Sequence, residues 1–279
     1  MSTWREALKA GEEMLTRSGV PDGAYDAWAL MEFAFAMEKS YYFLHADDQM
    51  EEKQKERYGE ILEKRAQRIP LQQITGSAWF MGYEFYVNDQ VLIPRFDTEI
   101  LVEEAGKLLG QERKLLDLCT GSGCVLLSLL AEHRKLSLTG MGVDISPQAL
   151  AVAKENARRL DVKAEFVESD LFSKVQGKYH VITANPPYIA SKVIEELMPE
   201  VRDHEPHLAL DGKEDGLYFY RKIVEQAPKY LKKGGWLCFE IGYDQGESLK
   251  AMLEERGYDQ IRIVKDLAGL DRVALGQKN

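Results

Sequence analysis

The chain has 279 residues, enough for one large or two ordinary domains with a sizeable buried core. Its 36 Lys and Arg residues and 46 Asp and Glu residues give a net charge of −10, which argues against a protein that grips nucleic acid phosphates through a basic surface. The three cysteines have no metal-ligand spacing, and neither a signal-peptide core nor a run of about 18 apolar residues is present, so we expect a cytoplasmic protein with no metal site, no stable nucleic acid binding and no membrane association.

Residues 1–75 predict a small helical domain. Apolar residues recur at helical spacing between 27 and 37, and the charged stretch 48–68 is typical of a second, exposed helix. We expect most of the aromatic side chains of this part to lie in its core. These are Trp28, Phe33, Phe35, Tyr41, Tyr42 and Phe43.

Residues 76–97 predict a β-hairpin linker. Aromatic and β-branched residues run from Trp79 to Ile93 and are interrupted by Gly82 and by Asn88-Asp89, which favours two strands and a turn. A helix is predicted next, over Thr98–Leu109.

Residues 98–279 predict an α/β domain, because apolar strands and helical segments alternate from Lys114 onward. Such alternation is typical of a parallel, doubly wound sheet with helices on both faces. The connection before the last strand is too short for a crossover, so the last two strands should pair as an antiparallel edge hairpin. The predicted strands are Leu115–Cys119, Leu138–Val143, Ala164–Val167, His180–Ala184, Trp236–Ile241, Ile261–Val264 and Arg272–Leu275, and the clearest helices are Pro147–Arg159, Gly216–Tyr230 and Gln245–Arg256.

Polar sites follow the first three predicted strands, at the edge where such sheets bind ligands. In Asp117–Gly123, Gly121 and Gly123 allow a tight turn and a close backbone approach at a helix N-terminus. Asp144 lies where a ribose-binding carboxylate belongs, and Asp170-Leu171 is placed to meet an adenine edge and face. A lone Gly-x-Gly fits a nicotinamide-dependent oxidoreductase equally well.

The fourth strand ends in Asn185-Pro186-Pro187-Tyr188. Two prolines fix φ near −65° and donate no hydrogen bonds, so the turn is rigid. The Asn185 side-chain oxygen and the Pro186 carbonyl are two acceptors that suit both hydrogens of an –NH2 group, and Tyr188 offers a flat face for a planar amide or base. This arrangement suits methylation of a planar nitrogen.

The sequence resembles the class I methyltransferases that use S-adenosylmethionine and, more narrowly, the peptide chain release factor glutamine methyltransferases. The resemblance covers nearly the whole chain. Its motifs are Pro70–Gly76, Val91–Arg95 with Thr98-Glu99, Asp117–Gly123, Val143–Pro147, Asn185–Tyr188, Glu200–Arg202 with Glu205-Pro206, Leu208–Gly212, Glu214–Gly216, Glu240–Gly242 and Lys265–Gly269.

The resemblance implies a Rossmann-like, seven-stranded catalytic domain, an N-terminal helical domain that recognises the substrate, and a hairpin between them. It implies that the enzyme methylates the glutamine of a Gly-Gly-Gln motif in release factors on its side-chain nitrogen. Asn185, Pro186, Pro187 and Tyr188 match the positions that hold this glutamine. The positions that match cofactor contacts are Cys119, Thr120, Gly121, Ser122, Gly123, Asp144, Asp170, Leu171 and Asn185.

The sequence departs from the family pattern in three places. Cys119 replaces a usual glycine, Phe96-Asp97 replaces a more usual Pro-Glu, and Leu171 stands where some relatives carry an aromatic residue. An adenine-specific DNA methyltransferase is the nearest alternative, because the Asn185–Tyr188 turn would hold a flipped base equally well. A binding module that has lost turnover is a further alternative, which the intact turn disfavours.

Overall fold

The computed structural model describes residues 2–111 and 113–279 and divides into two compact units. The smaller unit contains residues 2–77 together with Met198–His204, and the larger contains Ala78–Leu197 and Glu205–Asn279. The chain therefore passes between the units three times. The expected linker, residues 76–97, falls almost entirely within the larger unit.

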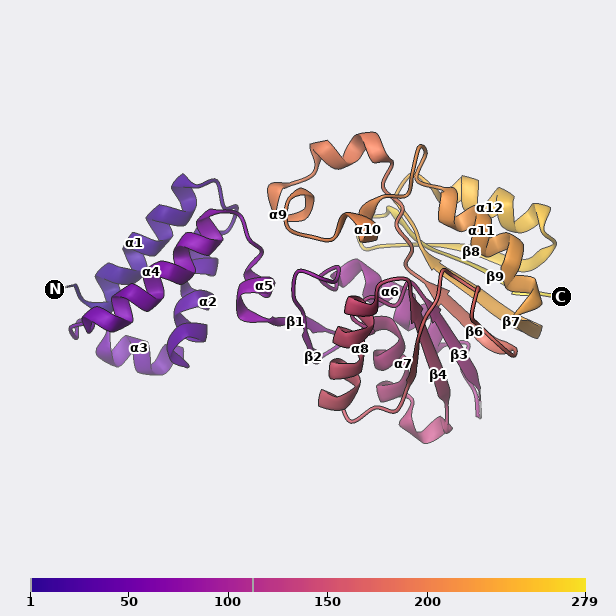
Figure 1. The fold of residues 1–279 in the computed structure, drawn as a ribbon, viewed down its shortest axis with the longest axis horizontal. Coiled ribbons are helices and arrows are strands. Elements are labelled where there is room, and N and C mark those ends of the chain that lie inside the picture. The colour runs from indigo at the N-terminus through magenta and orange to yellow at the C-terminus, as the bar shows by residue number, and fades with distance from the viewer. Residues whose placement is uncertain (1, 112) are drawn as a thin grey trace. The chain divides into compact units, whose positions relative to one another are not determined.

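The smaller unit is a bundle of helices, as the spacing of its apolar residues predicts (Figure 1). Its first helix begins with a capping box, in which the Thr3 hydroxyl accepts from the Glu6 backbone and the Glu6 carboxylate accepts from the Thr3 backbone. The helices are α1 (Trp4–Arg17), α2 (Gly23–Phe35), α3 (Lys39–His45), α4 (Glu52–Ala66) and α5 (Leu71–Thr75), and Met198–His204 adds the single turn α9 (Pro199–Arg202).

The prediction for the aromatic core of this unit is wrong for half of its members. Tyr42 is buried, and Trp28 and Phe35 pack against the core. Phe33, Tyr41 and Phe43 are 45–76% exposed. On α3 only Tyr42 is buried, so its neighbours, about 100° to either side around the helix, face outward.

A buried ion network holds Met198–His204 within the smaller unit. Arg65 is 5% exposed, and its guanidinium donates to Asp26 Oδ2 at 2.6 Å and to Glu200 Oε1 at 2.8 Å. Arg68 donates to both oxygens of Glu200, at 2.7 and 2.6 Å. The hydrogen bond from Gln73 to the backbone carbonyl of His204, 2.8 Å long, adds to this network.

The larger unit is built on a seven-stranded sheet with the order β5-β4-β3-β6-β7-β9-β8. The strands β3 to β7 are parallel, and β9 lies antiparallel between β7 and β8, so the terminal hairpin pairs as the sequence predicts. The strands are β3 (Lys114–Leu118), β4 (Thr139–Asp144), β5 (Glu165–Glu168), β6 (Tyr179–Ala184), β7 (Leu231–Glu240), β8 (Tyr258–Lys265) and β9 (Asp271–Lys278).

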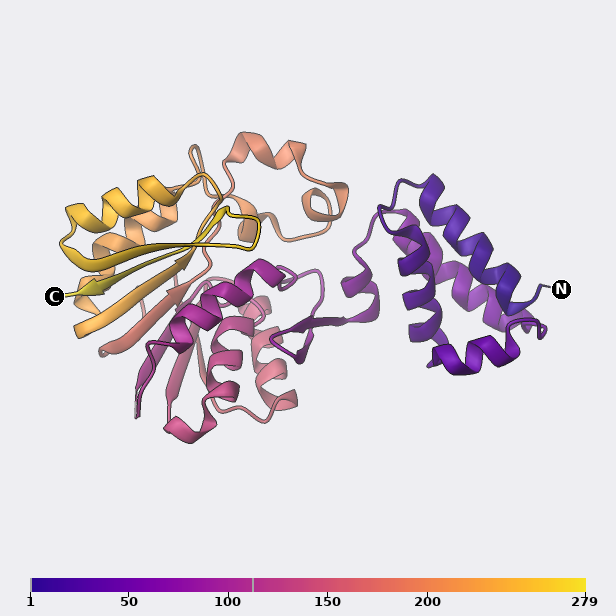
Figure 2. The same ribbon diagram turned by 180° about the vertical axis from the view of Figure 1, so that it is seen from behind.

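Helices cover both faces of this sheet, because successive strand residues point to opposite sides. On one face Leu116 and Ile182 pack among residues of α11 and α12, and on the other Leu115 and Val181 pack among residues of α6 and α7. Figures 1 and 2 show these two layers from opposite sides. The helices of this unit are α6 (Phe96–Gly106), α7 (Cys124–Glu132), α8 (Pro147–Arg159), α10 (His207–Leu210), α11 (Tyr218–Gln226) and α12 (Gly246–Glu255), with 3-10 turns η1 (Arg134–Leu136), η2 (Ser191–Glu196) and η3 (Ala227–Lys229).

The predicted hairpin is shorter than the sequence suggests. Its strands β1 (Ser77–Phe80) and β2 (Tyr83–Tyr86) form a separate two-stranded sheet. Val91 and Ile93 are buried but belong to no strand, because an apolar run indicates burial without deciding the backbone pairing.

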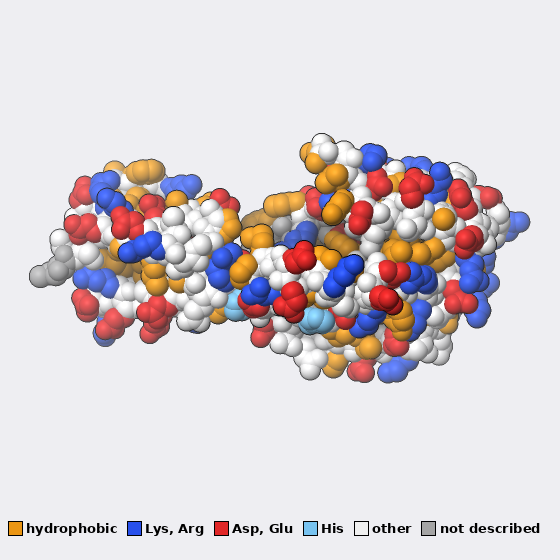
Figure 3. Space-filling model, turned by 90° about the horizontal axis from the view of Figure 1, so that it is seen from above, with side chains coloured by type: hydrophobic (Ala, Val, Ile, Leu, Met, Phe, Trp, Pro, Cys, Tyr) orange, Lys and Arg blue, Asp and Glu red, His pale blue; other side chains and the backbone are white. Residues whose placement is uncertain are grey.

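The described residues include no helix that is long and apolar enough to cross a membrane. On the face drawn in Figure 3, acidic and basic side chains are interspersed and form no extended basic stripe.

Candidate active site

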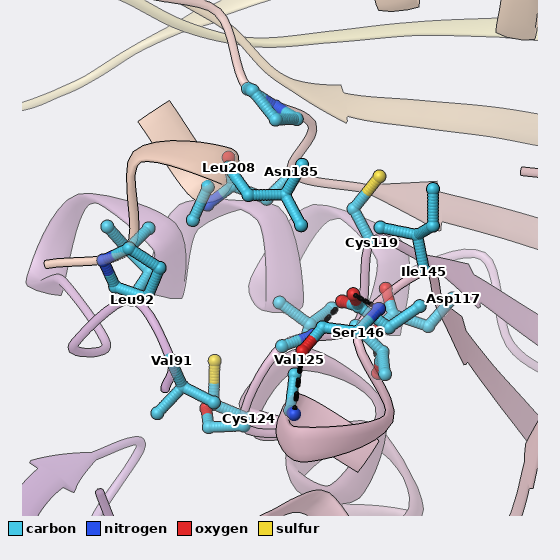
Figure 4. A pocket seen from close by; sticks show the side chains of 18 of the residues that line it. Val91, Leu92, Asp117, Cys119, Cys124, Val125, Ile145, Ser146, Asn185 and Leu208 are labelled. Carbon is cyan, nitrogen blue, oxygen red and sulfur yellow. Dashed lines mark hydrogen bonds between the residues drawn. The ribbon is translucent and has the colours of Figure 1, made fainter. Parts of the chain in front are cut away.

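A cavity of about 310 Å³ lies at the carboxyl ends of β3, β4, β5 and β6, within the larger unit. The chain runs outward from β3 through β4 to β5 and then restarts on the other side with β6, so the cavity lies where the strand order reverses. Ligands bind in this crevice in open α/β sheets. In Figure 4, Val91 and Leu92 lie on one side of the cavity, Cys119 and Ile145 on the other, and Asn185 and Leu208 above.

The loop after β3 is fixed by the carboxylate that ends β4. Asp144 Oδ2 accepts from the Gly121 backbone N–H at 2.9 Å, and Asp144 Oδ1 accepts from that of Ser146 at 3.0 Å. Burial raises the pKa of Asp144, and the backbone hydrogen bonds oppose this change. Asp144 is thus held rigidly in the cavity wall while it still lines the space.

Gly121 and Gly123 have positive φ, +53° and +80°, which favours glycine. A Cβ added at Gly121 would meet no atom within 4 Å, so this part of the loop is open. A Cβ at Gly123 would lie 3.1 Å from Leu127 Cδ1, so this glycine permits close packing of the loop on α7. Cys119 also has a positive φ, +55°, where the family more often has glycine, and it lines the cavity.

The other two predicted loop residues, Thr120 and Ser122, form hydrogen bonds that stabilise the loop. Thr120 and Ser122 are buried and line the cavity. The Thr120 hydroxyl donates to Asp117 Oδ2 at 2.6 Å, and the Ser122 carbonyl accepts from Asn156 at 2.9 Å.

Asp170 and Leu171 line the cavity beyond β5. Asp170 is exposed, so its carboxylate is available to a ligand. Leu171 is 7% exposed and has φ +47°, and its backbone carbonyl accepts from the Ser169 hydroxyl at 2.8 Å.

The turn after β6 divides between the cavity and the protein interior. Asn185 and Pro187 line the cavity, whereas Pro186 and Tyr188 are not among the lining residues. Pro186 is buried, and the Tyr188 hydroxyl donates to Glu240 Oε1 at 3.2 Å. The structure therefore brings Asn185 together with all the predicted cofactor residues except Gly123, which is not among the lining residues.

Asp117 is a cavity residue that the sequence interpretation did not select. It is 2% exposed, and its carboxylate accepts from the hydroxyls of Thr120 and Thr183 at 2.6 and 2.7 Å. Burial raises the pKa of Asp117 to about 6, although both hydroxyls act in the opposite direction. An acid inside an apolar strand, directly before a glycine loop, was the available signal.

Two further segments that the sequence interpretation did not select contribute to the cavity wall. The first contributes Gln90, Val91, Leu92, Pro94, Arg95 and Thr98, and the second contributes Pro206, Leu208 and Ala209. Arg95 forms an ion pair with Glu205, whose side chain is almost fully buried. These segments carry ordinary apolar and charged residues, so only the family resemblance draws attention to them. Within the described chain, no group of three His, Cys, Asp or Glu side chains is placed to hold a metal ion.

Two family models match the chain. The PrmC N-terminal domain matches residues 6–76, and the methyltransferase small domain matches residues 94–213.

Curated relatives match over almost the full length. A release factor glutamine methyltransferase of Caulobacter vibrioides is 38% identical over 279 residues, which covers 98% of this chain and 96% of the relative. One of Cereibacter sphaeroides is 40% identical over 270 residues, 96% of each chain. One of Geobacter sulfurreducens is 36% identical over 276 residues, 99% of this chain and 96% of the relative.

Solved structures share the fold at low identity. A methyltransferase from Pyrococcus furiosus matches with TM-score 0.53 and 16% identity, over 80% of this chain and 98% of that one. A 16S rRNA methyltransferase of T. thermophilus, solved with AdoMet and guanosine, matches with TM-score 0.52 and 17% identity, over 73% of this chain and 50% of that one. These neighbours confirm the methyltransferase sheet that the sequence predicts.

Proposed function

Because the chain belongs to the release factor glutamine methyltransferase family, we propose that it methylates the side-chain nitrogen of a glutamine in peptide chain release factors, with S-adenosylmethionine as the methyl donor. The glutamine is that of the Gly-Gly-Gln motif. One observation carries the proposal: Asn185 opens onto the same cavity as the Gly121 loop, Asp144 and Asp170.

The cavity residues fit the donor. The open Cβ position at Gly121 leaves room beside the loop backbone, and the exposed carboxylate of Asp170 is available for the amino group at the adenine edge. Asp144 would hold the ribose hydroxyls, and Leu171 and Ile145 provide apolar surface for the adenine. Cys119 and Ser122 would line the side of the loop that faces the donor. S-adenosylmethionine, when bound, would supply a methyl group on a positively charged sulfur. The glutamine nitrogen would gain this methyl as the carbon–sulfur bond breaks and leaves a neutral thioether, and one nitrogen proton would pass to solvent.

The Asn185–Tyr188 turn orients the nucleophile. An amide nitrogen is a poor nucleophile because its lone pair is delocalised into the carbonyl. Asn185 Oδ1 and the Pro186 carbonyl accept the two N–H bonds, which holds the nitrogen in one direction and favours pyramidal character. Positioning of this kind contributes up to roughly 7–11 kcal/mol in well-oriented reactions. No residue needs to remove a proton first, because the N–H becomes acidic only after methyl transfer has begun. Pro187 lines the cavity beside Asn185, whereas Tyr188 does not line it and would support the turn through the bond from its hydroxyl to Glu240.

The helical residues of the smaller unit are proposed to contact the body of the release factor. Support comes from the family match to residues 6–76 and from the size of a protein substrate. A cytoplasmic location is part of the same proposal, since release factors act with ribosomes.

The direct test is methyl transfer from labelled S-adenosylmethionine to a purified release factor. The control is the same factor with the Gly-Gly-Gln glutamine changed to alanine. Label on the first and none on the second is the expected result. Equal labelling of both would place the methyl on another residue and refute the proposal.

A further inference from the structure

Tyr188, the last residue of the Asn185–Tyr188 turn, is held at two separate points. Its hydroxyl donates to Glu240 Oε1 at 3.2 Å. Its backbone carbonyl accepts from Gln245 Nε2 at 3.0 Å, and Gln245 Oε1 in turn accepts from the Gly242 backbone N–H at 2.9 Å. The hydroxyl of Tyr188 is therefore bound to the last residue of β7, and its backbone carbonyl is bound to the segment that follows this strand.

Two glycines enclose the backbone of the same residue. A Cβ at Gly212 would lie 2.8 Å from the Tyr188 Cα and carbonyl carbon, and a Cβ at Gly216 would lie 2.3 Å from the backbone carbonyl oxygen of Tyr188. Real Cβ contacts are not this short, so any side chain at either position would displace the turn. The neighbouring Ile189 pairs with this loop through backbone hydrogen bonds to Leu210 and Gly212, at 3.1 and 2.8 Å.

Glu240 is itself a fixed point. It ends β7, is 2% exposed, and its backbone carbonyl accepts from the hydroxyl of the fully buried Tyr220 at 2.8 Å. Its Oε2 atom has no hydrogen-bond partner among the described residues. Burial raises the pKa of Glu240, and hydrogen bonds with Thr98 and Tyr188 and the positive charge of Arg272 act in the opposite direction, so the carboxylate is held by polar and charged neighbours.

The rigid turn couples the position of Tyr188 to that of Asn185, which lines the cavity. Only Pro186 and Pro187 separate Tyr188 from Asn185, and both have φ restricted to about −65°. Both prolines are also buried, so the connection has little freedom to bend. A displacement at Tyr188 therefore moves Asn185 as well.

We propose that Glu240 and Gln245 are positioning residues that hold Tyr188 and thereby set the direction of Asn185 Oδ1 and of the Pro186 carbonyl. The inference rests on the proposed function for the effect on catalysis, but the positioning itself is a property of the free protein. Neither residue lines the cavity, so neither contacts the substrate or the donor.

The test compares Tyr188→Phe with Tyr179→Phe, which is its matched control. Tyr179 begins the same strand, β6, and its hydroxyl donates to the Gln176 carbonyl at 2.9 Å, at the end of the strand away from the cavity. Each variant loses one hydroxyl and keeps the ring. The third variant, Glu240→Leu, removes the acceptor, and a double variant combines it with Tyr188→Phe.

Two readouts are needed. The first is kcat, KM for the release factor and donor affinity. We expect Tyr188→Phe and Glu240→Leu to lower kcat by about 10- to 100-fold with KM and donor affinity within twofold, since a displacement of about 1 Å suffices for such a loss. The double variant should be no slower than the slower single variant, because both substitutions remove the same hydrogen bond, the one between Tyr188 and Glu240. The second is nitrogen-15 relaxation of the Asn185 side-chain amide without substrate, which should show greater mobility in Tyr188→Phe than in Tyr179→Phe.

The outcomes separate the two proposals. If the unaltered enzyme does not label the release factor, the proposed function fails, and the relaxation of Asn185 alone decides the positioning. If labelling occurs but Tyr188→Phe matches Tyr179→Phe in kcat and in Asn185 mobility, the positioning proposal is overturned. Should Glu240→Leu fail to fold, Tyr188→Phe decides the question by itself.

Discussion

Replacement of Glu200 by alanine should destabilise the smaller unit substantially. The change leaves Arg65, which is 5% exposed, with Asp26 as its remaining carboxylate partner and leaves Arg68 without the two bonds it donates to Glu200. Breaking a buried ion pair costs about 3–5 kcal/mol, and the retained Asp26 places this case near 3 kcal/mol. That loss corresponds to about 100-fold faster exchange of amide hydrogens that exchange through unfolding of this unit.

Hydrogen exchange followed by mass spectrometry on peptides from α2 and α4 measures this effect where it should occur. The matched control is Asp203→Ala on the same segment, since Asp203 pairs with Arg202 at the surface. Surface pairs contribute little to stability, so this control should leave exchange nearly unchanged. Equal exchange in the two variants would show that the buried network does not stabilise the unit.

The same network predicts the acid limit of this unit. Burial alone would raise the pKa of Glu200, but hydrogen bonds from Arg68 and Arg65 outweigh it and lower the pKa to about 2. The folded-state pKa lies below the ordinary value of 4.5, so the stabilisation from Glu200 is complete above pH 4.5 and is lost as the pH falls toward 2. The Glu200→Ala variant should lack this part of the acid transition.

Three further predictions concern the cavity. Asn185→Ala should remove most methyl transfer while the donor affinity measured by calorimetry stays nearly unchanged, and a near-normal rate would disprove the two-acceptor model. Asp144→Ala should weaken donor binding by about 10- to 100-fold, since a hydrogen bond to a charged group contributes about 1.5–3 kcal/mol, and unchanged affinity would refute its ribose role. Asp117, with a pKa raised from 3.8 to about 6 by burial, should lower the free energy of unfolding by up to about 3 kcal/mol as the pH rises between these values. Asp117→Asn should remove this pH dependence, which denaturant titrations of both proteins between pH 3.8 and about 6 would measure. If the free energy of unfolding of the variant still fell with rising pH as in the unaltered protein, Asp117 would not be its cause.

Local signals in the sequence account well for the elements of the larger unit. Ser146-Pro147 combines a capping hydroxyl with proline at the first helical position, and α8 spans the predicted Pro147–Arg159. The strands were predictable because apolar, β-branched runs of strand length carry their own signal. The short connection between the last two strands fixed their antiparallel pairing, but no local pattern shows that β9 inserts next to β7.

The site was predictable in part for the same reason. Asn185 and Asp144 follow strands directly, so the topology alone brings them to one edge. The sequence predicts a flat face at Tyr188 for the substrate but gives no partner for its hydroxyl, which bonds to Glu240, 52 residues away. A hydrogen bond between two side chains that are far apart in the sequence produces no periodic pattern, because neither residue is required for the helix or strand in which its partner lies.

The smaller unit is built from two segments of the chain that are far apart in the sequence, and this affects its folding during synthesis. Arg65 leaves the ribosome 135 residues before Glu200, and the strands β1 to β6 are made in between. The helices therefore emerge first, and until Glu200 has been synthesised the Arg65 guanidinium has only Asp26 as its carboxylate partner. Domains tend to fold in order of synthesis, and here the first one to emerge reaches its final stability only after the β6 strand of the other has been translated. The speed of translation through residues 78–197 thus sets how long the helical unit remains in its less stable form.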